Sequence, residues 1–131
     1  GNGGATPAVL GWSSLRSLAD AGVSMGSHTR THPMMDQITL EDAREEIQGS
    51  MADLNRELGS VAPVFAYPAG RHSAGVARVL EESGVQLAFT TIPGVNEVRR
   101  SDRLRLRRVH VGARTGLAGL RAQLLGIRPA T

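Results

Sequence analysis

Apolar side chains recur at helical spacing in four parts of the chain. The longest stripe predicts a helix over residues 39–58, with inward positions Ala43, Ile47, Met51, Leu54 and Leu58. Shorter stripes predict helices over residues 12–21, 73–83 and 115–125. Trp12 lies on the apolar stripe of the first of these helices, so it is expected in the core.

Residue types at the ends of the stripes indicate where the helices begin and end. Thr39 with Asp42 resembles a capping box, in which side chains accept hydrogen bonds from the free N–H groups of the first turn. Gly59 follows the long stripe and is expected to end that helix. Ser73 is the expected cap of the third helix.

Four short apolar runs between the helices have the length of strands. They cover residues 23–27, 64–67, 85–91 and 104–111, and the polar segments 28–38 and 92–103 are expected to be loops. His110 falls in the alternating pattern of the last run and is expected to be structural. Helices and strands therefore alternate, which predicts an α/β fold with a mostly parallel sheet.

Length and composition narrow the class of protein. A chain of 131 residues that is 40% hydrophobic and 21% charged is expected to form one globular domain. No apolar run reaches the roughly 18 residues of a membrane-spanning helix. The chain has no cysteine, which excludes disulfide scaffolds and thiolate chemistry. We expect a Gly-rich lead-in over residues 1–11 that is not a signal peptide, a domain over residues 12–125 and a tail over residues 126–131.

The charge is distributed unevenly. All 15 basic residues are arginines: residues 1–98 carry six of them against eleven acidic residues, and residues 99–131 carry nine against one. This raises the hypothesis that residues 99–108 bind an anion or a nucleic acid. However, the alternation of arginine and leucine there is typical of a half-solvated strand, and the segment lacks aromatic side chains on which bases could stack. We therefore expect no nucleic-acid partner.

Two histidines in the loop after the first predicted strand form the strongest chemical signal. His28 and His32 are four residues apart, so their imidazoles can bind one metal ion if the backbone curls through about one turn. Thr29 and Thr31 could orient the rings through hydrogen bonds. The alternative is a pair of solvated loop histidines. Their position at the end of a strand, where α/β folds gather binding groups, favours the metal site.

The motif FAYPAG over residues 65–70 forms a second signal at the end of the second predicted strand. Pro68 and Gly70 predict a tight turn that can bring the backbone close to a ligand. The Tyr67 side chain could line a cleft there, and a nearby N–H could stabilise an oxyanion. The alternative is an ordinary turn between a strand and a helix. His72, just beyond the turn, is expected at the surface or at the start of a helix.

The two motifs together, GSHTRTHP over residues 26–33 and FAYPAG over residues 65–70, resemble those of the polysaccharide deacetylases with a NodB-homology domain, carbohydrate esterase family 4. The resemblance extends from about Trp12 to Leu125. It implies a partial distorted (β/α) barrel with mostly parallel strands. It also implies a hydrolase of non-peptide C–N bonds that removes acetyl groups from N-acetylated polysaccharide or oligosaccharide. A location in the cell envelope or outside the cell follows by analogy only.

The family resemblance also implies roles for single residues. His28 and His32 would bind a divalent metal ion, with Zn²⁺ as the first choice and Co²⁺ or a similar ion as the alternative. The backbone N–H of Tyr67, the expected catalytic residue, would help to hold the oxyanion. Pro68 and Gly70 would form the wall of the substrate groove.

The chain departs from the family pattern at its start. The family's adjacent aspartates supply the catalytic base and the third metal ligand, but nothing before His28 matches them, and Asp20 stands alone in a predicted helix. Many members also carry an arginine where this chain has Ala66. We interpret the chain as an amino-terminally truncated piece that lacks hydrolytic competence by itself. The alternative is a non-catalytic relative that binds metal or glycan.

Overall fold

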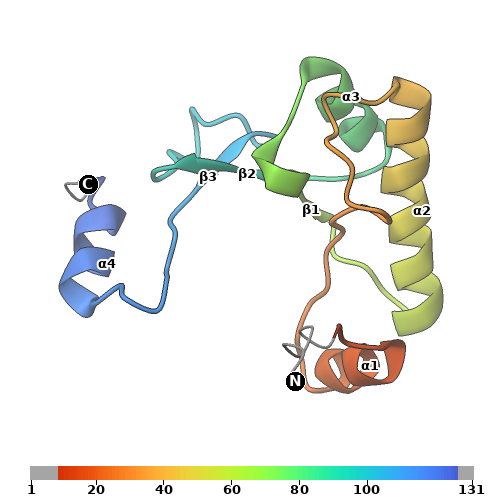
Figure 1. The fold of residues 1–131 in the computed structure, drawn as a ribbon, viewed down its shortest axis with the longest axis horizontal. Coiled ribbons are helices and arrows are strands. Elements are labelled where there is room, and N and C mark those ends of the chain that lie inside the picture. The colour runs from red at the N-terminus through yellow and green to blue at the C-terminus, as the bar shows by residue number, and fades with distance from the viewer. Residues whose placement is uncertain (1–8, 127–131) are drawn as a thin grey trace, which may run out of the picture.

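Helices and strands are interspersed along residues 9–126, the part of the chain that the computed structural model describes (Figure 1). The elements in chain order are α1 (Trp12–Asp20), α2 (Leu40–Leu58), β1 (Val64–Ala66), the 3-10 turn η1 (Pro68–Gly70), α3 (Ala74–Glu82), β2 (Leu87–Pro93), β3 (Leu106–Arg108) and α4 (Leu117–Leu124). The order confirms the predicted α/β class. Most of the predicted lead-in and tail lies outside the described residues.

The sheet is parallel throughout, with the strand order β1–β2–β3. A further segment joins its edge through one parallel bridge between Ser27 and Phe65. There the Ser27 N–H donates to Val64 O at 3.1 Å, and the Ala66 N–H donates to Ser27 O at 3.0 Å. The strand predicted over residues 23–27 is therefore represented by this bridge, which places the start of the histidine loop beside the end of β1.

The other strand predictions differ from the structure in extent. β2 spans Leu87–Pro93, so it begins two residues later than predicted and ends two residues later, inside the predicted loop. Val85 lies outside it because its N–H donates to Leu80 O at 3.0 Å at the end of α3. β3 covers three residues of the predicted 104–111 run. Leu104 precedes it and is only 6% exposed, so this residue serves the core rather than the ladder.

The predicted caps of the two central helices are present. The Thr39 hydroxyl accepts from the Asp42 N–H at 3.1 Å at the start of α2, and Gly59 ends that helix with a left-handed φ of 80°. Ser73 caps α3 by accepting from the Val76 N–H at 3.2 Å. These contacts confirm the predicted starts of both helices and the predicted end of α2.

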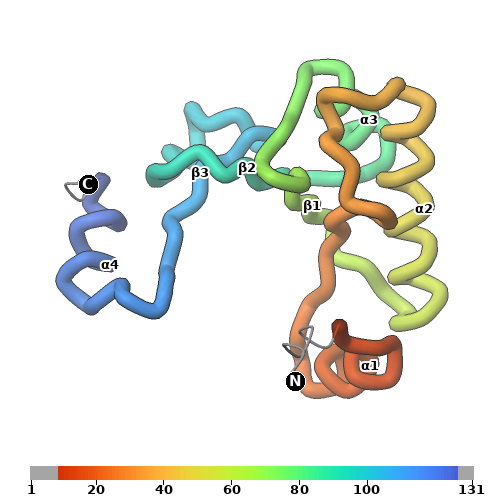
Figure 2. Tube along the Cα trace, in the orientation of Figure 1, coloured from red at the N-terminus to blue at the C-terminus, as the bar shows by residue number. Residues whose placement is uncertain are grey.

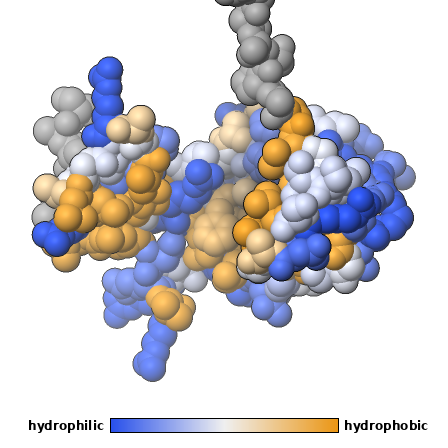
Figure 3. All heavy atoms as spheres, turned by 90° about the horizontal axis from the view of Figure 1, so that it is seen from below, coloured by the Kyte–Doolittle hydropathy of each residue, from blue (hydrophilic) through white to orange (hydrophobic). Residues whose placement is uncertain are grey.

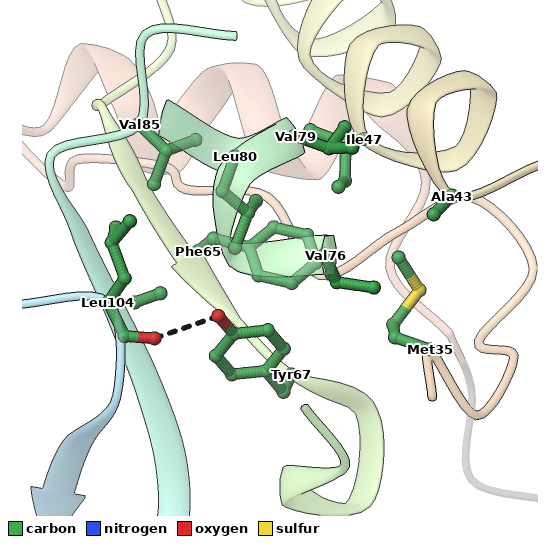
Figure 4. Packing of buried hydrophobic residues seen from close by; sticks show 11 residues of the cluster. Met35, Ala43, Ile47, Phe65, Tyr67, Val76, Val79, Leu80, Val85 and Leu104 are labelled. Carbon is green, nitrogen blue, oxygen red and sulfur yellow. Dashed lines mark hydrogen bonds between the residues drawn. The ribbon is translucent and has the colours of Figure 1, made fainter. Parts of the chain in front are cut away.

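The core lies between the sheet and the helices α2 and α3 (Figure 4). Its buried members are Met35, Ala43, Ile47, Phe65, Tyr67, Val76, Val79, Leu80, Val85, Ala88 and Leu104. The Tyr67 hydroxyl donates to Leu104 O at 2.7 Å across this core, as the dashed line in Figure 4 shows. This bond fixes the Tyr67 side chain, directly after β1, at the start of the FAYPAG turn.

The first and last helices lack this support. Neither α1 nor α4 has a buried residue, and Trp12 is 38% exposed, so the expectation that Trp12 lies in the core is wrong. The trace in Figure 2 shows α4 standing apart from the other helices at the end of an extended segment. Hydrophobic side chains are visible on that outlying lobe in Figure 3, where Leu117, Leu124 and Leu125 are exposed. Among residues 9–126, no helix has the length and apolar character needed to cross a bilayer.

Candidate active site

The histidine loop brings its two imidazoles together. The ring centroids of His28 and His32 lie 5.0 Å apart, and the rings meet edge to face at 72°. The His28 Nδ1 lies 2.7 Å from Ala66 O. Because a carbonyl oxygen only accepts, Nδ1 carries the proton of this hydrogen bond. Nε2 of a neutral His28 therefore keeps its lone pair, as a metal-binding imidazole requires.

This spacing suits two ligands of one ion. Two imidazoles on a tetrahedral zinc ion, with Zn–N bonds of about 2.0–2.1 Å, would have ring centroids roughly 5 Å apart. The residues present thus fit two positions of such a centre. The described residues contain no group of three or more His, Asp or Glu side chains able to hold a metal, so the pair is an incomplete ligand set within this part of the chain.

The loop reaches this arrangement through unusual backbone angles. Thr29 and His32 have left-handed φ values of 72° and 59°, which cost non-glycine residues about 1–3 kcal/mol each. The Thr29 hydroxyl accepts from the His32 N–H at 3.0 Å, so one strained residue supports the other. At the base of the loop, the Ser27 hydroxyl meets the Ser50 hydroxyl of α2 in a buried contact. The sequence predicted that Thr29 and Thr31 orient the two rings. In the structure the Thr29 hydroxyl binds the His32 backbone rather than a ring, and the Thr31 hydroxyl donates to Glu46.

Two carboxylates of α2 also contact the loop. Glu46 accepts hydrogen bonds from Arg30 and Thr31, and Asp53 accepts both guanidinium N–H groups of Arg30 at 2.8 and 2.9 Å. Partial burial by itself would raise the pKa of Glu46, but the hydrogen bonds from Thr31 and Arg30 outweigh it and hold that pKa below its ordinary value. Hydrogen bonding to Arg30 likewise lowers the pKa of Asp53.

Tyr67 belongs to the core rather than to a cleft. Its side chain is only 2% exposed, and its hydroxyl is bound to Leu104 O, so the expectation that this side chain lines a cleft is wrong. Burial, followed by the nearby Asp102 charge, raises the pKa of Tyr67 well above its ordinary value. Its backbone N–H donates to Phe89 O at 3.0 Å. Both polar groups of Tyr67 that could donate are thus engaged.

The turn after Tyr67 presents a different residue to solvent. Pro68 and Gly70 are buried, whereas Ala69 between them is exposed and has a left-handed φ of 51°. A Cβ on Gly70 would lie 2.1 Å from Thr91 Oγ1, so glycine is required by the close approach of β2. No described residue accepts a hydrogen bond from the Ala69 N–H. This donor was not identified from the sequence. The available signal was its position: Pro68 has no N–H, so Ala69 is the first residue after Tyr67 that can donate from the turn.

The remaining candidates have other contacts than the histidine pair. The His72 ring is half-buried 5.7 Å from the Tyr67 ring, with its Nδ1 3.0 Å from Gly70 O. His110 is exposed. Several arginines of the 99–108 segment are partnered by acids, in the pairs Arg100–Glu97, Arg103–Glu81 and Arg105–Asp102. This pairing reduces the positive charge available to an anion and weakens the hypothesis of an anion site there.

A comparison with known families identifies the class. The family model described as polysaccharide deacetylase matches residues 3–88, which is more than half of the chain. The chain belongs to the polysaccharide deacetylase family. A curated relative of Bacillus subtilis, YxkH, is 27% identical over 80 residues that make up 61% of this chain and 29% of the relative. The chain thus spans less than a third of that relative's length.

Solved structures of the family agree with the fold. The deacetylase PplD of Streptococcus pyogenes, solved with acetate, is 22% identical with a TM-score of 0.82, covering 95% of this chain and 54% of its own. BA0330 of Bacillus anthracis is 26% identical with a TM-score of 0.81, over 91% of this chain and 38% of its own. A family 4 carbohydrate esterase of Streptomyces lividans matches at 26% identity and a TM-score of 0.56, over 60% of this chain and 40% of its own. The parallel sheet and these relatives confirm the expected partial NodB-type barrel.

Proposed function

We propose that this chain carries the two-histidine half of the metal centre of a deacetylase that hydrolyses acetamide C–N bonds on N-acetylated carbohydrate. The observation that supports this most directly is the 5.0 Å separation of the His28 and His32 rings, with the Nε2 lone pair of His28 left free by Ala66 O. Family membership supplies the reaction class. The proposed substrate is an N-acetylated polysaccharide or oligosaccharide.

His28 and His32 are the proposed ligands of a divalent ion, Zn²⁺ first and Co²⁺ or a similar ion second. When bound, such an ion polarises an amide carbonyl and lowers the pKa of a bound water. Glu46 and Asp53 already accept hydrogen bonds from the histidine loop, so we assign neither of them as the base. The third ligand and the base remain unassigned within residues 9–126, in keeping with the missing aspartate pair.

The backbone of the FAYPAG turn is the proposed oxyanion site. A Tyr67 N–H acting there would have to leave Phe89 O, whereas the Ala69 N–H needs no such rearrangement. We therefore propose Ala69 as the direct donor and Tyr67 as the residue that anchors the turn to β2. Pro68 and Gly70 shape the groove wall through the backbone, since both are buried beside the exposed Ala69.

Metal binding is tested by titrating the 131-residue chain with Co²⁺ and Zn²⁺ in a calorimeter. We expect measurable binding that His28→Ala or His32→Ala abolishes, because each variant removes one of two nitrogen ligands. His110→Ala is the matched control, since His110 is exposed and lies outside the loop. Equal binding by all four proteins would contradict the proposed ligands.

Turnover is tested by acetate release from acetylated chito-oligosaccharides. We expect none from this chain alone and metal-dependent release from the full-length protein encoded by its gene, with loss in the His28→Ala variant. A full-length protein that binds the oligosaccharide but releases no acetate would instead support the alternative of a non-catalytic glycan-binding relative.

A further inference from the structure

Glu46 of α2 makes three hydrogen bonds to the histidine loop. Its Oε2 accepts from the Arg30 N–H at 2.7 Å and from the Thr31 N–H at 3.0 Å, and its Oε1 accepts from the Thr31 hydroxyl. Two of these donors are consecutive backbone N–H groups in a segment without regular structure. The Glu46 side chain therefore accepts hydrogen bonds from all three of these donors in the middle of the loop. Its own position is fixed because Ile47, the next residue of α2, is fully buried.

The residues that Glu46 holds lie between the two strained positions of the loop. Thr29 and His32 have left-handed backbones, and Arg30 and Thr31 separate them. Such backbone angles in non-glycine residues persist when the surrounding contacts over-determine them. The position of the His32 ring relative to His28 follows from these angles, so the contacts of Glu46 act directly on the geometry of the pair.

A second contact secures the same segment from the next turns of α2. The Arg30 guanidinium lies across the helix and meets Asp53 through two hydrogen bonds, at 2.8 and 2.9 Å. Gly49 lies between the two carboxylates in sequence, and a Cβ there would come within 2.7 Å of Arg30 Cζ. The helix thus presents an acid, a glycine and an acid at positions 46, 49 and 53, and the loop fits onto that row.

We propose that Glu46 is a positioning residue that holds His28 and His32 in a metal-binding arrangement, with the Arg30–Asp53 pair as a second anchor. The inference concerns this chain's own loop, and it rests on the proposed function only for the presence of the metal. Its test therefore needs one measurement with metal and one without.

The experiment compares the unmodified chain with Glu46→Ala and Glu45→Ala. Alanine leaves no side-chain acceptor at position 46, whereas glutamine would keep a carbonyl oxygen for the two backbone N–H groups. Glu45 is the matched control because it is exposed, precedes Glu46 on α2 and also acts electrostatically on Arg30, with no hydrogen bond to the loop. We expect Glu46→Ala to weaken Co²⁺ affinity by about tenfold or more, the range seen when supports of metal ligands are removed. Glu45→Ala is expected to change the affinity by less than about twofold.

The measurement without metal is amide hydrogen exchange at Arg30 and Thr31. We expect exchange there to be about tenfold faster in Glu46→Ala, with Ile47 and other core amides unchanged, because only the loop loses its acceptor. Unchanged exchange at Arg30 and Thr31 would overturn the proposal whether or not metal binds. If the unmodified chain binds no Co²⁺, the proposed metal function fails, while the exchange rates still decide the role of Glu46.

A second variant covers the possibility that Glu46→Ala does not fold. Thr31→Val keeps the shape of an exposed side chain and removes only the hydroxyl that donates to Glu46. We expect a smaller loss of Co²⁺ affinity, about threefold, with the melting temperature unchanged. An affinity equal to that of the unmodified chain would contradict the proposed positioning role.

Discussion

The histidine loop with α2 and the last described segment, residues 109–126, differ in how their polar groups are satisfied. In the first region, α2 side chains accept hydrogen bonds from a loop that lies 15 to 23 residues earlier in the chain. In the second, the bonds are local, such as Gly112 N–H to Thr115 Oγ1 and Thr115 N–H to Gly112 O. The first region also packs onto the core, whereas α4 has no buried residue.

This difference explains why two helices that both have apolar sequence patterns contribute differently to the core. Both α2 and α4 were predicted from apolar spacing, and both form. The stripe of α2 meets β1 and α3, so its carboxylates have defined positions from which to hold the loop. Residues that bind a ligand in a fixed geometry need supporting contacts that hold them, and the histidine loop has such contacts from α2.

The two helices should differ most in how much an alanine substitution on each lowers the free energy of unfolding. Ile47→Ala should lower the free energy of unfolding by about 3 kcal/mol, because it leaves a cavity beneath α2. Leu124→Ala on α4 should change it by less than about 0.5 kcal/mol, since that side chain is 58% exposed. Urea unfolding followed by circular dichroism measures both. Equal losses would remove the contrast between the two regions.

The next effect concerns the hydrogen bond between Tyr67, directly after β1, and Leu104, shortly before β3. Tyr67→Phe should cost about 1–2 kcal/mol, because it leaves the Leu104 carbonyl in the core without its donor. Urea unfolding again provides the measurement. A change of no more than a few tenths of a kcal/mol would show that water replaces the hydroxyl.

Tyr67 also makes a prediction at alkaline pH, since it is the single tyrosine of the chain. Its pKa is raised in the folded state, so its contribution to stability is complete below the ordinary value of about 10 and declines as pH rises through the folded-state value. The ultraviolet signal of tyrosinate should therefore appear only well above pH 10, together with unfolding. A reversible titration near pH 10 in the folded chain would contradict the buried position.

A smaller effect is expected at Asp102, which orders the approach to β3. The Leu104 N–H donates to this carboxylate at 2.9 Å and, with Arg105, lowers its pKa despite partial burial. Its contribution is present above the ordinary pKa of about 3.9 and is lost as pH falls through the lower folded-state value. Asp102→Asn should cost less than about 1 kcal/mol at neutral pH, after allowance for solvent screening. Unfolding of both proteins at pH 7 and pH 3 measures it: the difference should shrink at pH 3.

The smallest effect is expected in the exposed arginine segment. Arg100 and Glu97 form a pair at 3.6 Å with side chains that are 85% and 71% exposed. Arg100→Ala should change the free energy of unfolding by less than about 0.5 kcal/mol, because water and salt screen such a pair. Thermal unfolding at low and high salt measures it. A loss comparable to that of Tyr67→Phe would show that this segment is more tightly organised than its exposure indicates.

Local patterns in the sequence were enough to predict most of the fold. The caps Thr39 and Ser73, the stop at Gly59 and the buried stripe through Ala43 and Ile47 depend on neighbours in the chain, so they could be read directly. The strands were harder, because their lengths depend on partners. The run at residues 23–27 contributes one bridge, since only Ser27 pairs with β1 in the described structure.

The candidate site divides in the same way. His28 and His32 were identified from their spacing, and their role as metal ligands stays a prediction; the structure adds that their ring centroids lie 5.0 Å apart. The roles of Glu46, Asp53 and the Ala69 N–H were not predicted, because each depends on which groups the folded chain brings together. Tyr67 was expected to line a cleft for a related reason: nothing in the motif reveals that Leu104 lies within reach of its hydroxyl.

The α/β class, the ends of the central helices, the histidine pair and the family resemblance could be derived from the sequence. These properties follow from side-chain types at short spacings, where the geometry of a helix or turn is already known. Three further features became visible in the folded chain: α2 supplies the carboxylates beneath the histidine loop, Trp12 is exposed, and the FAYPAG turn presents Ala69. Those outcomes depend on contacts between residues far apart in the chain, and such contacts form only when the whole core packs.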